Sequence, residues 1–266
     1  MGAMKVWAGA AATILCAALI SLFAATTPRN DLPERTIGAY TTDLQARSPA
    51  QRHNARLAGN RLHGSVIAPG REFSFNHTVS AWNFASGYRK APVSYEGRLV
   101  GAFGGGVCQV STTLYNAALI AGMPIRERHR HAVAPSYVPP GRDAAVAYDT
   151  LDLRLLNTLP TPIRIEVEVR SASLTVLLRA RTAARPKYSI VTRVLSTTEP
   201  TAVLVREPQG QRARPYSGVH SPGQTGWRVV TYRCTEGKDG VVGRERISDD
   251  SYRSLDNVRL GPTGGL

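Results

Sequence analysis

The sequence predicts an α+β fold in which a helix packs against an antiparallel sheet and a small β-rich region completes the chain. Apolar residues recur at three- and four-residue steps over residues 107–121, just before Gly122, which predicts an amphipathic helix. Apolar and charged residues alternate strictly over 163–170, and the apolar segment 174–178 follows a short turn, which predicts a β-hairpin. With 42% hydrophobic and 20% charged residues, the 266-residue chain can bury a core, so a disordered polymer is excluded.

An uncharged apolar run, Val6–Ala25, lies near the amino terminus. Twenty residues of helix just span a hydrocarbon layer of ~30 Å. The run is longer than the apolar core of about 7–15 residues in a cleaved signal peptide, so an uncleaved membrane helix is favoured over cleavage near Ala24. In either case we expect export, as a single-pass membrane protein with an extracytoplasmic C-terminal domain or, if the signal is cleaved, as a secreted protein.

Three parts are expected along the chain. Residues 1–30 form the anchor and a linker, 31–182 the main domain, and 183–266 a β-rich C-terminal region. The strands expected in this last region are 189–194, 201–205, 227–233 and 241–247, with a turn over 236–240.

The first half of the main domain is expected to begin with a helix. Apolar positions share one face towards the end of residues 41–62, and Gly64 would stop the helix there. Residues 66–76 then have the pattern of a strand, a turn and a second strand.

The formal net charge of +14 comes from 33 basic and 19 acidic residues. A basic surface attracts polyanions, whether nucleic acid, anionic lipid heads or acidic cell-wall polymers. Nucleic acid is not expected as a partner, because the sequence has no run of five basic residues and no aromatic residues interleaved with basic ones. No Walker-type phosphate loop or zinc-ribbon spacing occurs either, so no cofactor is predicted.

Cys108 is the strongest candidate for chemistry. It follows Gly104, Gly105 and Gly106 and falls in the first turn of the predicted helix, where the positive end of the helix dipole favours a thiolate. Two other interpretations stay open, a disulfide with Cys234 in an oxidising compartment and a small apolar residue that only packs.

A cysteine nucleophile needs a base, and the nearest downstream candidates are His129 and His131. On a strand the two rings would point to the same face. Asp143 is the predicted orienting carboxylate, with Asp149 and Asp152 as further candidates. A structural role is an equal possibility for the histidines, and the spacing of these residues matches no known zinc site, so no metal is predicted.

The residues assigned to substrate binding surround Cys108 and include the glycines, which allow close approach of a substrate. They are Gly105, Gly106, Gln109, Ser111 and Thr112. Ser111 and Thr112 have a second interpretation, as polar residues that support the start of the helix.

The order of cysteine at a helix start, then histidine, then aspartate resembles the transglutaminase-like cysteine hydrolases. Gly106-Val107-Cys108 and Ala121-Gly122-Met123-Pro124-Ile125-Arg126 resemble motifs of that family. This resemblance implies a papain/transglutaminase-like helix packed against the antiparallel sheet.

A longer resemblance covers roughly residues 36 to 180. Its motifs are Pro69-Gly70, Phe73 to Asn76, Gly87-Tyr88 with Ala91-Pro92-Val93, the run Gly104 to Leu119, Glu127-Arg128-His129, and Gly141 to Ala144, and together they resemble the VanW family. The resemblance implies a bacterial cell-envelope protein, often membrane-anchored and associated with peptidoglycan. More loosely, residues 223–262 resemble the β domains that accompany VanW regions and bind cell-wall sugars.

The leading functional hypothesis is a cell-wall enzyme in which Cys108 attacks an amide of a peptidoglycan stem peptide, and water or an amine resolves the thioester. The alternative is a non-catalytic module that binds peptidoglycan or an anionic wall polymer. A scaffold for wall-synthesis enzymes is the third hypothesis.

Overall fold

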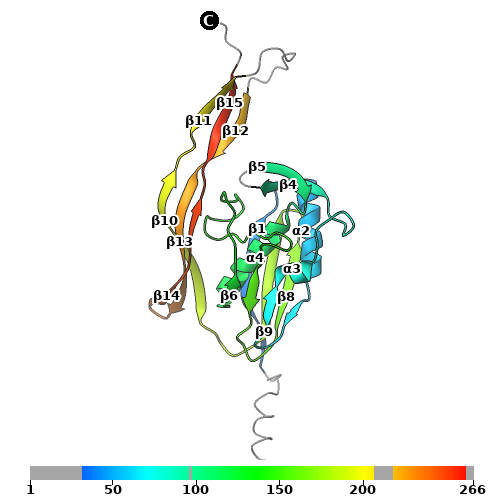
Figure 1. Ribbon diagram of the computed structural model, residues 1–266. Helices are drawn as coiled ribbons and strands as arrows, with labels where there is room; N and C mark the ends of the chain where they lie inside the picture. Colours follow the sequence, from blue (N-terminus) through cyan, green and yellow to red (C-terminus); the bar gives the residue numbers. More distant parts are fainter. Residues whose placement is uncertain (1–31, 96–97, 207–217, 262–266) are drawn as a thin grey trace, which may run out of the picture.

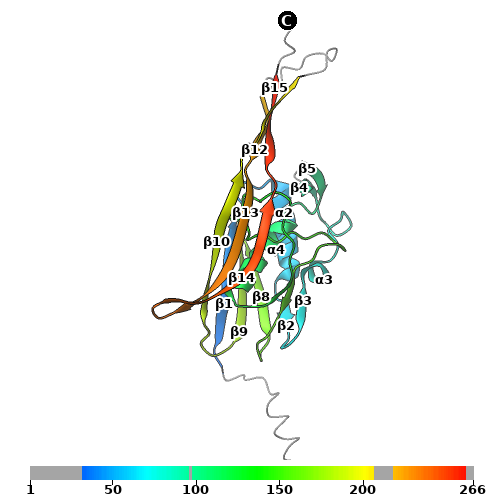
Figure 2. The same ribbon diagram turned by 60° about the vertical axis from the view of Figure 1, so that its left-hand side comes forward.

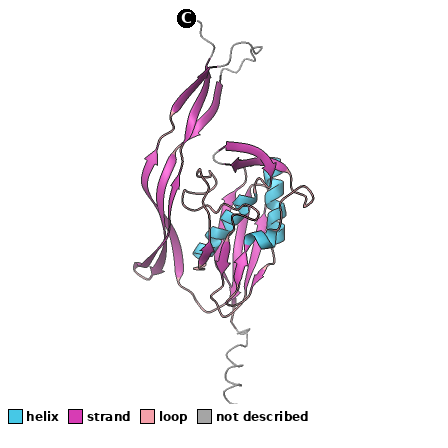
Figure 3. Cartoon of the chain, viewed as in Figure 1, coloured by secondary structure: helices cyan, strands magenta, loops and turns pink. Residues whose placement is uncertain are grey.

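A computed structural model describes residues 32–95, 98–206 and 218–261. Strands make up 47% of the structure and helices 16%, and the helices are confined to one half of the molecule (Figure 3). The predicted α+β fold with a papain/transglutaminase-like core is therefore wrong. The physical reason is the length of the C-terminal strands, which reach 12 and 13 residues and outweigh the helical part.

The main sheet has the antiparallel order β1-β9-β8-β2. Its strands are β1 (Glu34–Asp43), β9 (Ser173–Arg181), β8 (Ile163–Val169) and β2 (Val66–Ile67). The predicted hairpin is confirmed, because β8 and β9 pair from Ile163–Ala180 to Val169–Leu174. Apolar side chains of both strands alternate inward, as the sequence pattern requires.

Two longer helices cover one face of this sheet, α2 (Pro49–Leu62) and α4 (Val107–Ile120) (Figure 1). The predicted helix at 107–121 is confirmed. The helix expected from residue 41 instead begins at Pro49, because Ser48 caps it with a reciprocal bond to Gln51. Residues 41–43 belong to β1.

The core lies between α4 and the sheet. The buried side chains that fill it include Val110, Leu114, Leu119, Ile165, Leu174, Val176 and Leu178. Gly38 on β1 lets the helix approach closely, since a Cβ there would lie 2.2 Å from the carbonyl oxygen of Ala117.

Short elements surround this core. They are the helix α3 (Phe75–Val79), the sheet β3 (Glu72–Ser74), β7 (Arg154–Leu156) and β6 (Ile125–Glu127), and the hairpin β4 (Lys90–Tyr95) and β5 (Arg98–Phe103). The second strand expected within 66–76 ends at Ser74, whose side chain accepts a hydrogen bond from the His77 backbone and starts α3.

The C-terminal region consists of two three-stranded sheets that form an elongated arm beside the main domain (Figure 1). The nearer sheet contains β10 (Lys187–Thr198), β13 (Gly226–Gly237) and β14 (Gly240–Tyr252). The farther one contains β11 (Ala202–Arg206), β15 (Leu255–Gly261) and β12 (Gly218–Gln224). All four strands expected here exist, and the turn over 236–240 joins β13 to β14.

The nearer sheet packs against the main domain on the side of α4 (Figure 2). The Thr231 hydroxyl donates to the carbonyl oxygen of Gly141 at 3.0 Å, and Arg233 donates to that of Met123 at 2.9 Å. The Tyr252 hydroxyl accepts from the Gly141 backbone at 2.9 Å. The C-terminal region therefore holds the irregular segment that follows β6.

No helix in the described part of the chain is long and apolar enough to cross a membrane. The predicted anchor, Val6–Ala25, lies outside the described residues.

Candidate functional site

Cys108 is the second residue of α4, and Gly106 forms the cap of that helix in a left-handed conformation with φ 108°. A Cβ on Gly106 would lie 2.4 Å from the carbonyl oxygen of Gln51, so only glycine fits there without displacement. The cysteine is partly exposed, and its sulfur lies 3.3 Å from the carbonyl oxygen of Val146. The fold thus places a partly exposed cysteine at a helix amino terminus.

His131 and Asp143 meet beside this cysteine, although they are joined by an irregular segment and not by neighbouring strands. The His131 ring Nδ1 lies 2.6 Å from Asp143 Oδ2, and the His131 backbone N–H donates to the same oxygen at 2.7 Å. Because an ionised carboxylate only accepts, Nδ1 carries the proton, which leaves Nε2 for another partner.

The His131 ring also interacts with the thiol of Cys108. Burial opposes ionisation of the thiol, but the interaction with His131 outweighs it and lowers the pKa of Cys108. Burial likewise opposes the imidazolium, yet the interactions with Asp143 and Cys108 raise the pKa of His131 to about 10. Both shifts favour a thiolate–imidazolium pair.

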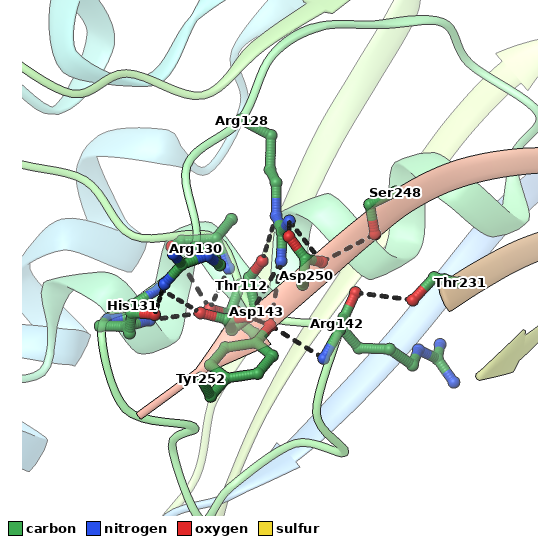
Figure 4. Close-up of polar contacts among 12 residues, drawn as sticks. Thr112, Arg128, Arg130, His131, Arg142, Asp143, Thr231, Ser248, Asp250 and Tyr252 are labelled. Atoms are coloured by element: carbon green, nitrogen blue, oxygen red, sulfur yellow. Dashed lines mark hydrogen bonds and ion pairs between the residues drawn. The ribbon is translucent and has the colours of Figure 1, made fainter. Parts of the chain in front are cut away.

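Asp143 is completely buried and has charged and polar partners on both oxygens (Figure 4). Its Oδ1 accepts from Arg128 Nη2 at 2.9 Å and from the Tyr252 hydroxyl at 2.5 Å. Burial raises the pKa of Asp143, but its bonds and charge interactions with His131 and Arg128 dominate and lower the pKa to about 2. The carboxylate is therefore ionised at neutral pH.

The other histidine lies apart from this group. His129 Nε2 pairs with Glu127 Oε1 at 2.9 Å, and its side chain is 38% exposed. Asp152 accepts from the Ser74 hydroxyl and from the Asn76 backbone, so it supports the start of α3. Of the two histidines that the sequence left open, the structure brings His131 to Cys108.

The polar side chains assigned to substrate binding face the protein interior. Gln109 donates to the carbonyl oxygen of Asp43 at 2.7 Å. Ser111 donates to the carbonyl oxygen of Ala144 at 2.7 Å, and Thr112 accepts from the Ala144 backbone at 3.0 Å. All three are buried. The bonds of Ser111 and Thr112 tie α4 to the segment carrying Asp143, and that of Gln109 ties it to β1, so substrate contact is not expected of these side chains.

The two glycines assigned to substrate binding differ in exposure. Gly105 is buried and its carbonyl accepts from Asn54 Nδ2 at 2.9 Å, whereas Gly106 is partly exposed. Gly106 is thus the more exposed of the two glycines.

Cys108 and Cys234 are both free. Cys234 is buried on β13, opposite Ser189 of β10 and Arg244 of β14. Among the described residues, no cluster of three or more histidine, cysteine or acidic side chains could hold a metal ion.

A polar cavity of about 560 Å³ opens close to the segment that touches Cys108. Its lining includes Asn76, Glu127, Tyr148 and Asp149. Tyr148 follows Val146 by two residues, but none of Cys108, His131 and Asp143 lines this cavity.

Three residues of the site were missed by the sequence analysis, Arg128, Asp250 and Tyr252. Arg128 stands in the Glu127-Arg128-His129 motif, of which only the histidine was predicted to be a site residue. Asp250 and Tyr252 lie more than 100 residues from Asp143 along the chain. No local pattern marks them, since their role depends on how β14 docks.

A partly exposed cysteine at a helix start, paired with an imidazole that a buried carboxylate orients, defines the class of protein. It is a β-rich protein in which a cysteine, a histidine and an aspartate lie together. Residues 50–179 match the family described as VanW like protein, which supports VanW family membership for this domain.

Two curated relatives match the same part of the chain. The chain is 37% identical over 142 residues to "Uncharacterized protein YoaR" of Bacillus subtilis (strain 168). This alignment covers 53% of this chain and 47% of the relative. The chain is 31% identical over 109 residues to "Vancomycin B-type resistance protein VanW" of Enterococcus faecalis (strain ATCC 700802 / V583), covering 39% and 40%. The chain thus spans less than half the length of these relatives. The VanW resemblance is confirmed, whereas these matches give no support to the transglutaminase-like one.

Solved structures share only a distant likeness with the chain. "IgA1 Protease G5 domain structure" is 16% identical with a TM-score of 0.20 and covers 31% of this chain and 96% of that one. "Crystal structure of HP0197-G5" is 13% identical with a TM-score of 0.17, covering 29% and 93%. TM-scores this low carry no structural argument.

Proposed function

We propose that this protein acts at the peptidoglycan of the bacterial cell envelope. Support comes from its membership of the VanW family and from the name of its Enterococcus relative, a vancomycin resistance protein. The net charge of +14 suits a partner among the anionic polymers of the wall. In this proposal the described residues lie outside the cytoplasm, held at the membrane by Val6–Ala25.

Within this setting the proposed activity is acyl transfer by Cys108. The single observation that carries it is the position of the His131 ring, which interacts with the Cys108 thiol and lies 2.6 Å from Asp143 Oδ2 through Nδ1. The thiolate attacks the carbonyl carbon of a stem-peptide amide, and the C–N bond breaks as His131 gives its proton to the departing amine. A thioester remains on Cys108. His131 then takes a proton from water or from an acceptor amine, which attacks the thioester and restores the thiolate.

The start of α4 supports the same chemistry. The backbone N–H groups of Val107 and Gln109 donate to the carbonyl oxygens of Gly104 and Gly106, and the N–H of Cys108 lies between them. A first-turn N–H in this position is suited to an oxyanion that develops on the attacked carbonyl. The partly exposed Gly106 leaves room for the substrate.

The second candidate is a binding module without catalysis. It is favoured by the arginines exposed on the C-terminal sheet, which are Arg193, Arg228, Arg244 and Arg246. Such a surface would bind an anionic wall polymer in a manner that salt weakens.

Soluble peptidoglycan fragments incubated with the full chain separate the two candidates. Mass spectrometry should detect loss of the departing amine, exchange for an added amine, or an acyl adduct on Cys108. The Cys108→Ala variant should form no product, whereas Cys234→Ala, the matched control, should remain active. Product formed by Cys108→Ala would overturn the acyl-transfer proposal. If no product forms and the Cys108→Ala variant still binds cell walls, the result would favour the binding module without catalysis.

A further inference from the structure

The buried carboxylate of Asp143 accepts four hydrogen bonds, two at each oxygen. His131 occupies Oδ2 twice, at 2.7 Å through its backbone and at 2.6 Å through its ring. Arg128 and Tyr252 occupy Oδ1, at 2.9 and 2.5 Å. An Asp carboxylate offers about four lone-pair positions, so Asp143 cannot rotate without breaking a bond in a fully buried place.

Tyr252, at the end of β14, is itself fixed in two ways. Its hydroxyl donates to Asp143 and accepts from the backbone N–H of Gly141. The side chain is buried, and the Arg130 guanidinium lies over its ring at 5.9 Å from the centroid. The hydroxyl is therefore directed at Asp143 by the docked sheet.

Asp250 reaches Asp143 through Arg128. Arg128 Nη1 donates to both oxygens of Asp250, at 2.7 and 2.8 Å. The Nε of the same guanidinium donates to the carbonyl oxygen of Asp143 at 2.7 Å, while its Nη2 donates to the carboxylate. The Ser248 hydroxyl bonds Asp250 at 2.7 Å and fixes its orientation. Figure 4 shows the guanidinium between the two carboxylates.

Other hydrogen bonds also attach the C-terminal sheet to the main domain. Thr231 and Arg233 already bind the backbone of Gly141 and Met123 without touching a side chain of the site. Tyr252 and Asp250 differ from them because their contacts end on Asp143 and on Arg128, its guanidinium partner.

We infer that β14 is part of the active site, with Tyr252 and Asp250 as positioning residues that hold Asp143, and through it the His131 ring, against Cys108. This inference rests on the proposed acyl-transfer function. It makes the C-terminal sheet a component of the site in addition to any role in wall binding. Displacement of β14 would leave the thiol without an oriented imidazole.

The rate of Cys108 alkylation by iodoacetamide, measured against pH on the full chain, tests the inference without a substrate. The variants are Tyr252→Phe, which removes one hydroxyl, and Asp250→Asn, which removes one charge. The matched controls on the same sheet are Tyr232→Phe and Asp249→Asn. Tyr232 contacts the Arg244 guanidinium, and Asp249 pairs at 3.7 Å with Arg228 and Arg246. Peptide mass mapping assigns the label to Cys108 rather than Cys234.

Loss of one hydrogen bond that positions the ring should slow alkylation at about pH 6 roughly fivefold and move the pH midpoint upward. A merely structural role would lower the melting temperature and leave that midpoint in place. The controls should match the wild type. Wild-type profiles for both test variants would overturn the inference while leaving a reactive Cys108 intact. A wild-type thiol that reacts only above about pH 8.5 would instead overturn the proposed function. If Tyr252→Phe does not fold, Asp250→Asn decides.

Discussion

The backbone N–H and the ring Nδ1 of His131 both bind one oxygen, Oδ2, of Asp143, at 2.7 and 2.6 Å. These two hydrogen bonds fix both the main chain and the ring of His131 to the same acceptor oxygen. The ring is directed at Cys108 as a result, and its tautomer is set by an ionised carboxylate. The relationship explains why one histidine of the pair, and not the other, belongs to the site.

Replacement of the two histidines should have unequal effects on Cys108. His131→Asn removes the group that lowers the thiol pKa, so alkylation at about pH 6 should slow about tenfold for each unit by which that pKa rises. His129→Asn removes only the partner of Glu127 and should leave the rate unchanged. Iodoacetamide kinetics with mass mapping measure both. Equal effects of the two variants would contradict this assignment.

Asp143→Asn should destabilise the fold. The change leaves Arg128 with Asp250 as its charged partner in a buried place and turns an acceptor that serves His131 into an amide. The expected loss in the free energy of unfolding is about 3 kcal/mol, measured by urea denaturation. The matched control is Asp149→Asn, an exposed turn residue with φ 63°, a conformation that asparagine tolerates. A loss as large in the control would show that the effect is not specific to the buried carboxylate.

The same carboxylate should make the free energy of unfolding depend on pH in the acid range. Its pKa lies at about 2, below the ordinary value of 3.8, so its contribution is present above that ordinary value and is lost as the pH falls through about 2. Between about pH 5 and 2 the wild type should lose up to about 2 kcal/mol more than Asp143→Asn does. Denaturation curves at the two pH values provide the comparison. Parallel losses in both proteins would mean that Asp143 is not ionised in the folded state.

Gly106→Ala should disturb the start of α4. The new Cβ would meet the Gln51 carbonyl oxygen at 2.4 Å in a conformation with φ 108°. We expect a loss of about 2 kcal/mol or more in the free energy of unfolding and slower alkylation of Cys108. Gly101→Ala, whose Cβ would meet nothing within 4 Å, should be close to wild type. Thermal melts and alkylation rates give both readouts, and wild-type values for Gly106→Ala would refute the close approach to Gln51.

Local patterns predicted the elements whose burial is periodic. The helix before Gly122 and the hairpin of β8 and β9 were found because each buries one face, and that face repeats in the sequence. The start of α2 was misplaced because residues 41–43 pair with β9, a contact with residues 173–175 that no local spacing records.

The overall fold class could not be obtained in the same way. The strands of the C-terminal region were located, but the predicted segments were shorter than β10, β13 and β14, which extend further at both ends. The strand β12 was not foreseen at all. Long exposed strands carry weak alternation because neither face is fully buried, so their lengths follow from pairing and not from hydrophobic period.

The sequence by itself determined that a cysteine stands at the start of an apolar helix, that a histidine and an aspartate follow it, and that the VanW motifs surround them. The docking of β14, which brings Asp250 and Tyr252 to Arg128 and Asp143, was decided only by the tertiary structure. The physical reason is the separation along the chain of the residues that make contact. Helices and hairpins arise from contacts between near neighbours, whereas a buried carboxylate collects its donors from whichever distant strands the packing brings within about 3 Å.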